Sequence, residues 1–266
     1  MRKNTRSKFK LKSIVLIVTM ILPLFTTNAL ISCIKKKNQR GLEKDKDLYG
    51  EFIDDFEKTR YGRPIRMKFD KNPIPVVIDT FDENSKQYII DGINALDEIS
   101  ENINYTIYDS SEKEFSPSDK IIKISILDST EYENKHGTIS SGKALMVYNN
   151  FTATIEFPIQ IDINEKMCDG YWDNLDGESI LTTVVKHELM HTLGFRDLYE
   201  TEDKKRSIMY FQICPGSPQT FTEEDVQKIQ QIYDGKSRDT DKEIVLKKDI
   251  SGTYAIVKKD DEELQM

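Results

Sequence analysis

Two histidines and a glutamate stand at a spacing that suits hydrolytic chemistry at a metal ion. His187 and His191 are four residues apart, and Glu188 directly follows the first of them. On an α-helix, residues at positions i and i+4 lie on the same face, so both imidazoles can bind one ion. Glu188 can then reach a zinc-bound water without being a ligand, accept its proton during attack and pass that proton to a leaving amine. The pattern predicts a catalytic zinc site on a helix.

A third ligand is expected where this helix ends. Gly194 lets the chain leave the helix abruptly, because glycine adopts the left-handed conformation that other residues resist. Asp197, ten residues after His187, can thereby return toward the two histidines. Three protein ligands and one open position are typical of a catalytic zinc site, whereas a structural site is usually closed by four.

The same motif would also be found in a helix that has lost activity, or in a surface helix whose histidines only make hydrogen bonds. Chance alone is a weak explanation, because the chain has 3 histidines and two of them fall in the motif. The third, His136, stands in a polar stretch, where we expect a solvated surface side chain and not a ligand.

The run from His187 to Asp197 resembles the extended zinc signature of the metzincin metalloproteases, and Ser207–Tyr210 resembles their Met-turn, in which Met209 packs beneath the metal. The matrixin-like group is the most similar, over residues 71–235. The resemblance implies a twisted mixed sheet of about five strands with an active-site helix, a Met-turn and a C-terminal helix. It also implies a zinc-dependent endopeptidase that hydrolyses peptide bonds in extracellular proteins or peptides, with one catalytic zinc ion and calcium sites left open.

In this family an extended substrate lies against an edge strand, a role that the resemblance gives here to Lys143–Tyr148. The segment Phe211–Phe221 would form part of the specificity pocket. Its side chains do not indicate which residue the pocket prefers.

Asp197 departs from the histidine of most metzincins and resembles the third ligand of snapalysin-type proteases. An anionic ligand donates more charge to zinc and makes it a weaker Lewis acid. Tyr210 directly follows Met209, as in matrixins.

Two alternative functions stay open. One is a gluzincin-type metallopeptidase whose third ligand is Glu223 or Glu224, and the other is a catalytically inactive surface-binding lipoprotein on a metzincin scaffold.

The elements that must position these residues follow from apolar periodicity. The order of strands and helices predicts an α/β or α+β fold with helices packed on a sheet. The third helix begins with a capping signal, Thr222 and Asp225. Pro158 weakens the last strand. The expected strands are Ile74–Asp79, Tyr105–Tyr108, Ile121–Leu127, Lys143–Tyr148 and Thr154–Ile163; the expected helices are Glu83–Asn102, one from about Glu178, and Thr222–Asp234.

The chain of 266 residues has a formal net charge of −8 that is unevenly spread. Residues 1–32 carry six basic and no acidic residues, which leaves 32 basic and 46 acidic residues from Cys33 onward, a net charge of −14. Such an acidic chain is a poor ligand for nucleic acid, whose phosphates require cations. We expect a monomer whose partners are a protein or peptide substrate and a membrane.

The basic start and the apolar run behind it are typical of a secretory signal over residues 1–32. Leu30–Cys33 resembles the lipobox of bacterial lipoproteins, in which Cys33 becomes acylated. This predicts a protein of the bacterial cell envelope, lipid-anchored to a membrane and facing outward. The alternative is an uncleaved transmembrane anchor. Residues 33–70 are expected to form a charged tether, 71–236 the catalytic domain and 237–266 a charged tail with a possible hairpin, Glu243–Lys247 with Thr253–Lys258.

Two further cysteines flank the motif. In an extracytoplasmic compartment Cys168 and Cys214 can close one disulfide. The alternative is two buried, unpaired thiols.

Overall fold

The computed structural model divides the chain into two units, Met1–Lys44 and Asp45–Met266. It describes residues 35–37, 39–69, 73–80, 82–116, 119–138, 140–168, 179–199, 207–211, 220–235, 244–248 and 254–258. In the first unit, residues 35–37 and 39–44 are helical. Within the described ranges, no helix combines the length and apolar character that crossing a membrane requires. The predicted signal peptide and Cys33 lie outside these ranges, so the lipid anchor stays a prediction.

A five-stranded sheet organises the second unit, in the order β2-β1-β3-β5-β4. The first four strands in this order pair in parallel, and β4 pairs antiparallel with β5 at one edge. The expected mixed α/β class with five strands is confirmed. β5 runs on through Pro158. The strands are β1 (Ile74–Asp79), β2 (Tyr105–Asp109), β3 (Ile122–Leu127), β4 (Gly142–Asn149) and β5 (Thr154–Asn164).

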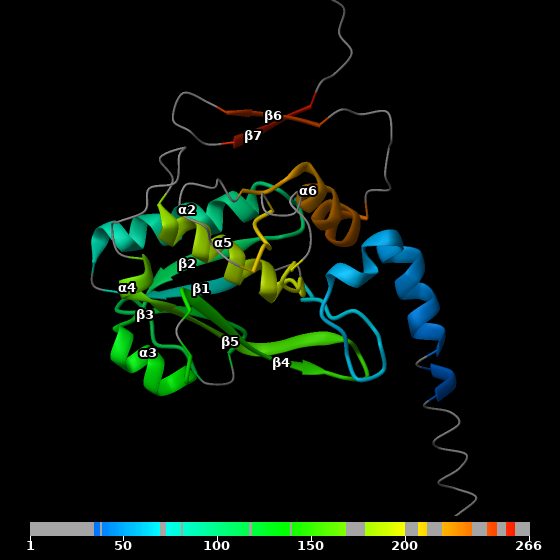
Figure 1. Ribbon diagram of the computed structural model, residues 1–266, viewed down its shortest axis with the longest axis horizontal. Coiled ribbons are helices and arrows are strands. Elements are labelled where there is room, and N and C mark those ends of the chain that lie inside the picture. The colour runs from blue at the N-terminus through cyan, green and yellow to red at the C-terminus, as the bar shows by residue number, and fades with distance from the viewer. Residues whose placement is uncertain are drawn as a thin grey trace, which may run out of the picture. The chain divides into compact units, whose positions relative to one another are not determined.

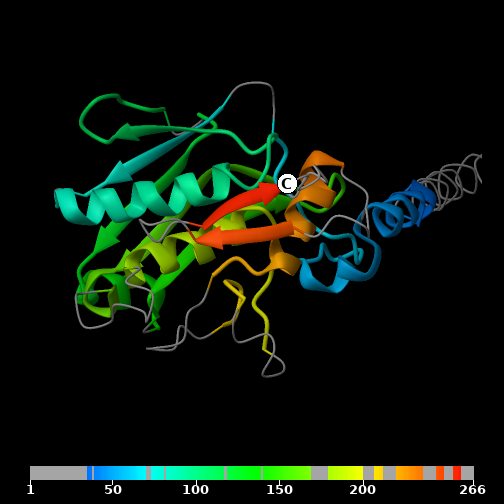
Figure 2. The ribbon, with the colours of Figure 1, turned by 90° about the horizontal axis from the view of Figure 1, so that it is seen from above.

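Two helices, α2 (Glu83–Asp97) and α5 (Ile180–Thr192), lie side by side over one face of the sheet, as Figures 1 and 2 show. Gly92 of α2 allows this close approach, because a Cβ there would lie 2.7 Å from Cγ1 of Val185. Every residue of α5 except His191 is buried. The helix is therefore enclosed on nearly all sides.

The C-terminal helix α6 (Glu223–Ile229) begins with the predicted capping box, in which Thr222 and Asp225 satisfy each other's backbone N–H groups. A π-helical segment, η3 (Gln230–Asp234), continues it, so the expected helix over Thr222–Asp234 is confirmed with a change of hydrogen-bonding pattern.

Two short helices were not predicted, α3 (Ser129–His136) and α4 (Glu165–Cys168). α3 is polar and buries only Tyr132, so it carries no helical stripe in the sequence. Outside the main sheet, the expected tail hairpin is present as β6 (Ile244–Lys248) paired antiparallel with β7 (Tyr254–Lys258).

The predicted tether over residues 33–70 is wrong from Asp45 onward. The segment 45–69 belongs to the compact unit and includes a 3-10 helix, η1 (Gly50–Asp55). Most of its charged residues are exposed, while apolar side chains enter the hydrophobic core and give it the burial that a solvated tether lacks. Its side chains that are buried in this core are Tyr49, Phe52, Phe56, Ile65 and Met67.

Candidate metal centre

Backbone carbonyls fix the orientation of both motif histidines. Nδ1 of His187 lies 2.7 Å from the carbonyl oxygen of Ile208, and Nδ1 of His191 lies 2.8 Å from that of Phe195. A carbonyl oxygen only accepts hydrogen bonds, so each Nδ1 donates and each Nε2 is left to bind a metal. The two Nε2 atoms lie 3.1 Å apart, a separation at which two lone pairs repel unless a cation holds them.

Asp197 lies against the same two nitrogens. Its Oδ1 is 3.2 Å from Nε2 of His187 and 3.5 Å from Nε2 of His191. Burial disfavours the charged carboxylate, but the interactions with His187 and His191 outweigh it and hold the pKa of Asp197 well below its usual range. Burial likewise lowers the pKa of His191, but Asp197 and Glu188 outweigh it and raise that pKa to about 9. These carboxylates stabilise positive charge between the histidines.

The three groups fit a metal ion in their spacing and in their chemistry. Ligand bonds of about 2.0–2.1 Å in a tetrahedron place the ligand atoms about 3.3 Å apart. The separations of 3.1, 3.2 and 3.5 Å among His187, His191 and Asp197 are close to that value. Within the described ranges, this is the one cluster of three metal-ligating side chains. It can hold a metal ion, as the sequence predicted.

The turn that carries Asp197 is fitted against segment 45–69. Gly194 has φ of +100°, and a Cβ there would lie 2.0 Å from the carbonyl oxygen of Ile65. The N–H of Glu57 donates to Gly194 O at 2.8 Å, and the N–H of Arg196 donates to Asp55 O at 3.0 Å. Glycine was expected here for its backbone conformation. The contact with Ile65 is a second reason, which the sequence does not reveal.

Glu188 lines the same cleft as the three ligands and is 5% exposed. A Cβ on Gly142 would lie 2.8 Å from Oε1 of Glu188, so this glycine at the start of β4 leaves the room that the carboxylate occupies. Glu188 is absent from the ligand cluster. It is a neighbour of the site, as its predicted role requires. Nothing in the sequence singles out Gly142.

The turn that holds His187 is tied to α6. Oγ of Ser207 donates to Asp225 at 3.0 Å, and the N–H of Met209 donates to the same Oγ at 3.1 Å. Met209 is buried, directly after the residue whose carbonyl orients His187. Asp225 therefore both caps the helix and anchors this turn, a second role that its capping position alone did not indicate.

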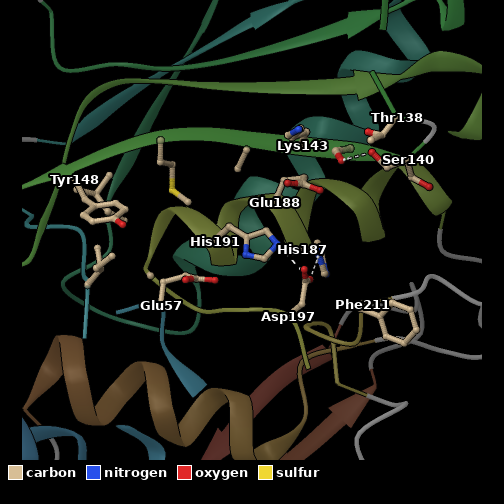
Figure 3. Close-up of a pocket in the computed structure, with 17 residues that line it drawn as sticks. Glu57, Thr138, Ser140, Lys143, Tyr148, His187, Glu188, His191, Asp197 and Phe211 are labelled. Carbon is tan, nitrogen blue, oxygen red and sulfur yellow. Dashed lines mark hydrogen bonds and ion pairs between the residues drawn. The ribbon is translucent and has the colours of Figure 1, made fainter. Parts of the chain in front are cut away.

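A cleft of about 470 Å³ runs between β4 and α5. Figure 3 shows His187, Glu188, His191 and Asp197 near its middle, Tyr148 and Glu57 toward one end, and Thr138, Ser140 and Phe211 toward the other. Phe211 is the first residue of the expected specificity segment. Residues 212–219 lie outside the described ranges.

Other predicted residues lie away from the site. Glu224 forms an ion pair with Lys228 at 2.6 Å. Neither Glu224 nor Glu223 belongs to the cluster of His187, His191 and Asp197, so the geometry does not support a gluzincin-type third ligand. The expectation for His136 was wrong. Its side chain is 3% exposed, with Nε2 2.8 Å from the fully buried Asp162, because α3 packs its end against β5.

Cys168 is a free thiol, with Sγ 3.8 Å from the carbonyl oxygen of Ser141. The expected disulfide with Cys214 is therefore not formed in this structure. Cys214 itself lies outside the described ranges. Burial, with a smaller contribution from Glu188, raises the pKa of Cys168 to about 12, which keeps the thiol protonated at neutral pH.

Comparison with known proteins assigns the chain to no family. No protein-family model matches it, and no curated protein is similar to it in sequence. The arguments for function come from the site itself.

Proposed function

We propose that the protein is a zinc-dependent endopeptidase of the metzincin kind. The observation that carries the proposal is the convergence of two Nε2 atoms and one carboxylate oxygen, 3.1–3.5 Å apart, on a cleft where Glu188 is the adjacent carboxylate. Two nitrogen ligands and one oxygen ligand suit zinc. The buried Met209 after Ile208 and the helix α6 behind it support the more specific metzincin arrangement.

In the proposed reaction, three residues would bind the metal ion and a fourth, Glu188, would transfer the proton. A bound zinc ion would supply Lewis-acid chemistry that acidifies water and polarises a peptide carbonyl. His187, His191 and Asp197 would hold that ion. Glu188 accepts the proton of the attacking water and delivers it to the leaving amine nitrogen. Its near-complete burial limits competing water around this carboxylate.

The edge strand β4 is suited to bind an extended peptide. It ends the sheet, so its outer backbone groups can pair with another strand. Tyr148 on this strand is 40% exposed, and Gly142, Ala144 and Met146 line the cleft along it. Main-chain pairing would place the substrate across the metal ligands. This accounts for an endopeptidase more directly than for cleavage of small molecules.

Location at the outer side of a bacterial envelope is part of the same proposal. It rests on the basic and apolar leader and on the residues that end at Cys33. A peptidase that is tethered there would act on extracellular proteins or peptides.

Three forms of the protein test the function: wild type, Glu188→Ala and Asp197→Ala, each assayed for bound zinc and for cleavage of a generic protein substrate. We expect Glu188→Ala to keep zinc and lose cleavage by several orders of magnitude. Asp197→Ala should lose affinity for zinc. Zinc-loaded wild type that cleaves nothing in a broad peptide library would instead favour the inactive surface-binding scaffold. Equal zinc binding in wild type and Asp197→Ala would move the third ligand elsewhere.

A further inference from the structure

Glu57 brings a carboxylate into the cleft from the wall opposite β4. Its backbone is fixed on both sides, because its N–H donates to Gly194 O at 2.8 Å and its carbonyl accepts from the N–H of Ile65 at 2.7 Å. Figure 3 shows its side chain beside His191, at the end of the cleft that Tyr148 marks. The position of Glu57 is thus set by the same turn that carries the third metal ligand.

The Glu57 carboxylate is open to an incoming cation. Its residue is exposed, and within the described ranges no lysine, arginine or histidine forms an ion pair with it. The adjacent Lys58 is engaged by Asp54. Three carboxylates, those of Glu57, Glu188 and Asp197, line the cleft together with one lysine, Lys143. Arg196 lines a neighbouring hollow with Glu57 but forms no ion pair with it within the described ranges.

Apolar surface surrounds this carboxylate within the cleft. The buried side chains of Ile65 and Ile155 line the cleft together with Glu57, Met146 and Tyr148 line it from β4, and Tyr148 is 40% exposed. Lysine and arginine side chains combine an apolar stem with a charged end, so they suit a surface that is apolar along its length and acidic at one point. An exposed aromatic ring adds a favourable contact for a cation.

We propose that Glu57 is a specificity-determining residue that receives a lysine or arginine side chain of the peptide substrate, on the side of the scissile bond nearer Tyr148. This inference rests on the proposed endopeptidase function. Antiparallel pairing is the commoner arrangement of neighbouring strands. Because β4 runs from Gly142, beside Glu188, toward Tyr148, a substrate paired antiparallel to it places this cationic residue N-terminal to the bond that is cleaved.

The test uses the zinc-loaded protein and a peptide library whose members are all acetylated at the N-terminus and amidated at the C-terminus. Blocking the ends leaves side chains as the only cations. Sequencing of the products should show lysine and arginine enriched at one position N-terminal to the cleaved bond. For the best peptide, replacing that lysine by glutamine should lower kcat/KM about fivefold, the upper range for a solvent-exposed ion pair.

Two variants and a matched control assign the preference to Glu57. Glu57→Gln should bring the lysine-to-glutamine ratio of kcat/KM to about 1, and Glu57→Lys should favour glutamate at that position. Glu98→Gln removes an equally exposed carboxylate at the end of α2, outside the cleft, and should leave the ratio unchanged. Zinc content and thermal unfolding of each variant show that the fold is intact.

The outcomes separate this inference from the function on which it rests. Cleavage by wild type without a cationic preference overturns the role of Glu57, as does a preference that survives in Glu57→Gln. Cleavage that occurs only in a second copy of the library with unblocked amino termini also overturns it, because the cation would then be the substrate's α-amine. Wild type with full zinc that cleaves no peptide at all contradicts the endopeptidase itself, and this inference falls with it.

Discussion

Helix α5 and segment 45–69 meet at the turn that carries Asp197, and they contribute to the candidate metal centre in different ways. α5 supplies His187, Glu188 and His191. Segment 45–69 supplies no ligand, but its backbone groups bond both sides of the turn, and the carbonyl of Ile65 fills the space next to Gly194. The residues that do the chemistry and the residues that hold them in position are therefore separate stretches of this chain, and only the first stretch has a recognisable residue pattern.

Deleting segment 45–69 should have the largest effect. The five side chains that it buries in the hydrophobic core each stabilise the fold by about 1.5–3 kcal/mol, and together they approach the whole stability of a typical domain, about 5–15 kcal/mol. A chain that begins at Asp70 should therefore be unfolded in circular dichroism and bind no zinc. A chain that begins at Asp45 is the control and should fold. Cooperative unfolding of the Asp70 form with zinc bound would show that segment 45–69 is an accessory to the site and not part of it.

Gly194→Ala should have the next largest effect, because it tests the contact between the two regions directly. The left-handed conformation costs a non-glycine residue about 1–3 kcal/mol, and the contact with Ile65 O adds about 1–3 kcal/mol of overpacking. Chemical denaturation should show a loss of about 3–5 kcal/mol, together with weaker zinc binding. Gly137→Ala is the matched control, since φ there is +66° with open space around it, and it should cost only about 1–2 kcal/mol. Equal losses at the two glycines would rule out a special role for Ile65.

Lys228→Met should have a moderate effect on stability. Lys228 is 2% exposed and joins Asp55 of segment 45–69, at 2.7 Å, to Glu224 of its own helix. Its removal leaves Asp55 without its partner, at a cost of about 2–3 kcal/mol. Glu224→Gln removes only the exposed partner and should cost less than about 1 kcal/mol. Denaturation of Lys228→Met/Asp55→Asn should recover part of the loss; no recovery would mean that Lys228 acts by packing alone.

The stabilisation by Lys228 should depend on pH in one direction. Burial disfavours its charge, but hydrogen bonds to Asp55 and Glu224 outweigh burial and raise the pKa of Lys228. A cation whose pKa is raised on folding contributes fully below its unfolded pKa, about 10.4, and loses that contribution as the pH rises through the folded value. The difference in stability between wild type and Lys228→Met should shrink in strongly alkaline solution. It should stay constant between pH 6 and 9.

The parts of this structure that the sequence predicted are those with a local signature. The strands β1 to β5, the helices α2, α5 and α6, and the candidate ligands His187, His191 and Asp197 follow from periodicity, capping and spacing. The roles of Gly142 and Ile65 do not, because each depends on which distant atom folding brings against it. His136 was misjudged for the same reason, since its partner Asp162 is 26 residues away.

Segment 45–69 was wrongly predicted as a tether because its composition is that of a solvated chain, although its apolar side chains are buried. Charged residues separate the apolar ones, as in a solvated tether, and Tyr49, Phe52 and Phe56 are helically spaced only over a short stretch. The decisive fact is that Phe56 packs on Phe195, with ring centroids 4.2 Å apart, a contact that spans 139 positions of sequence. No local sequence pattern predicts such a distant partner. A histidine pair at i and i+4, in contrast, can be recognised from the sequence of the helix alone.

His191→Ala should have the smallest effect on the stability of the metal-free protein. It tests a candidate ligand of α5, whereas the substitutions above test the contacts of segment 45–69. The substitution removes the hydrogen bond to Phe195 O and the contacts of Nε2 with His187 and Asp197, so in the presence of a chelator the free energy of unfolding should fall by only about 1–2 kcal/mol. Zinc at 1,000 times its dissociation constant should stabilise wild type by about 4 kcal/mol, because it binds only the folded chain, and should stabilise His191→Ala far less. If His191→Ala instead unfolds the metal-free protein, His191 also stabilises the fold. α5 would then provide both the metal-binding groups and the structural support that we assign to segment 45–69.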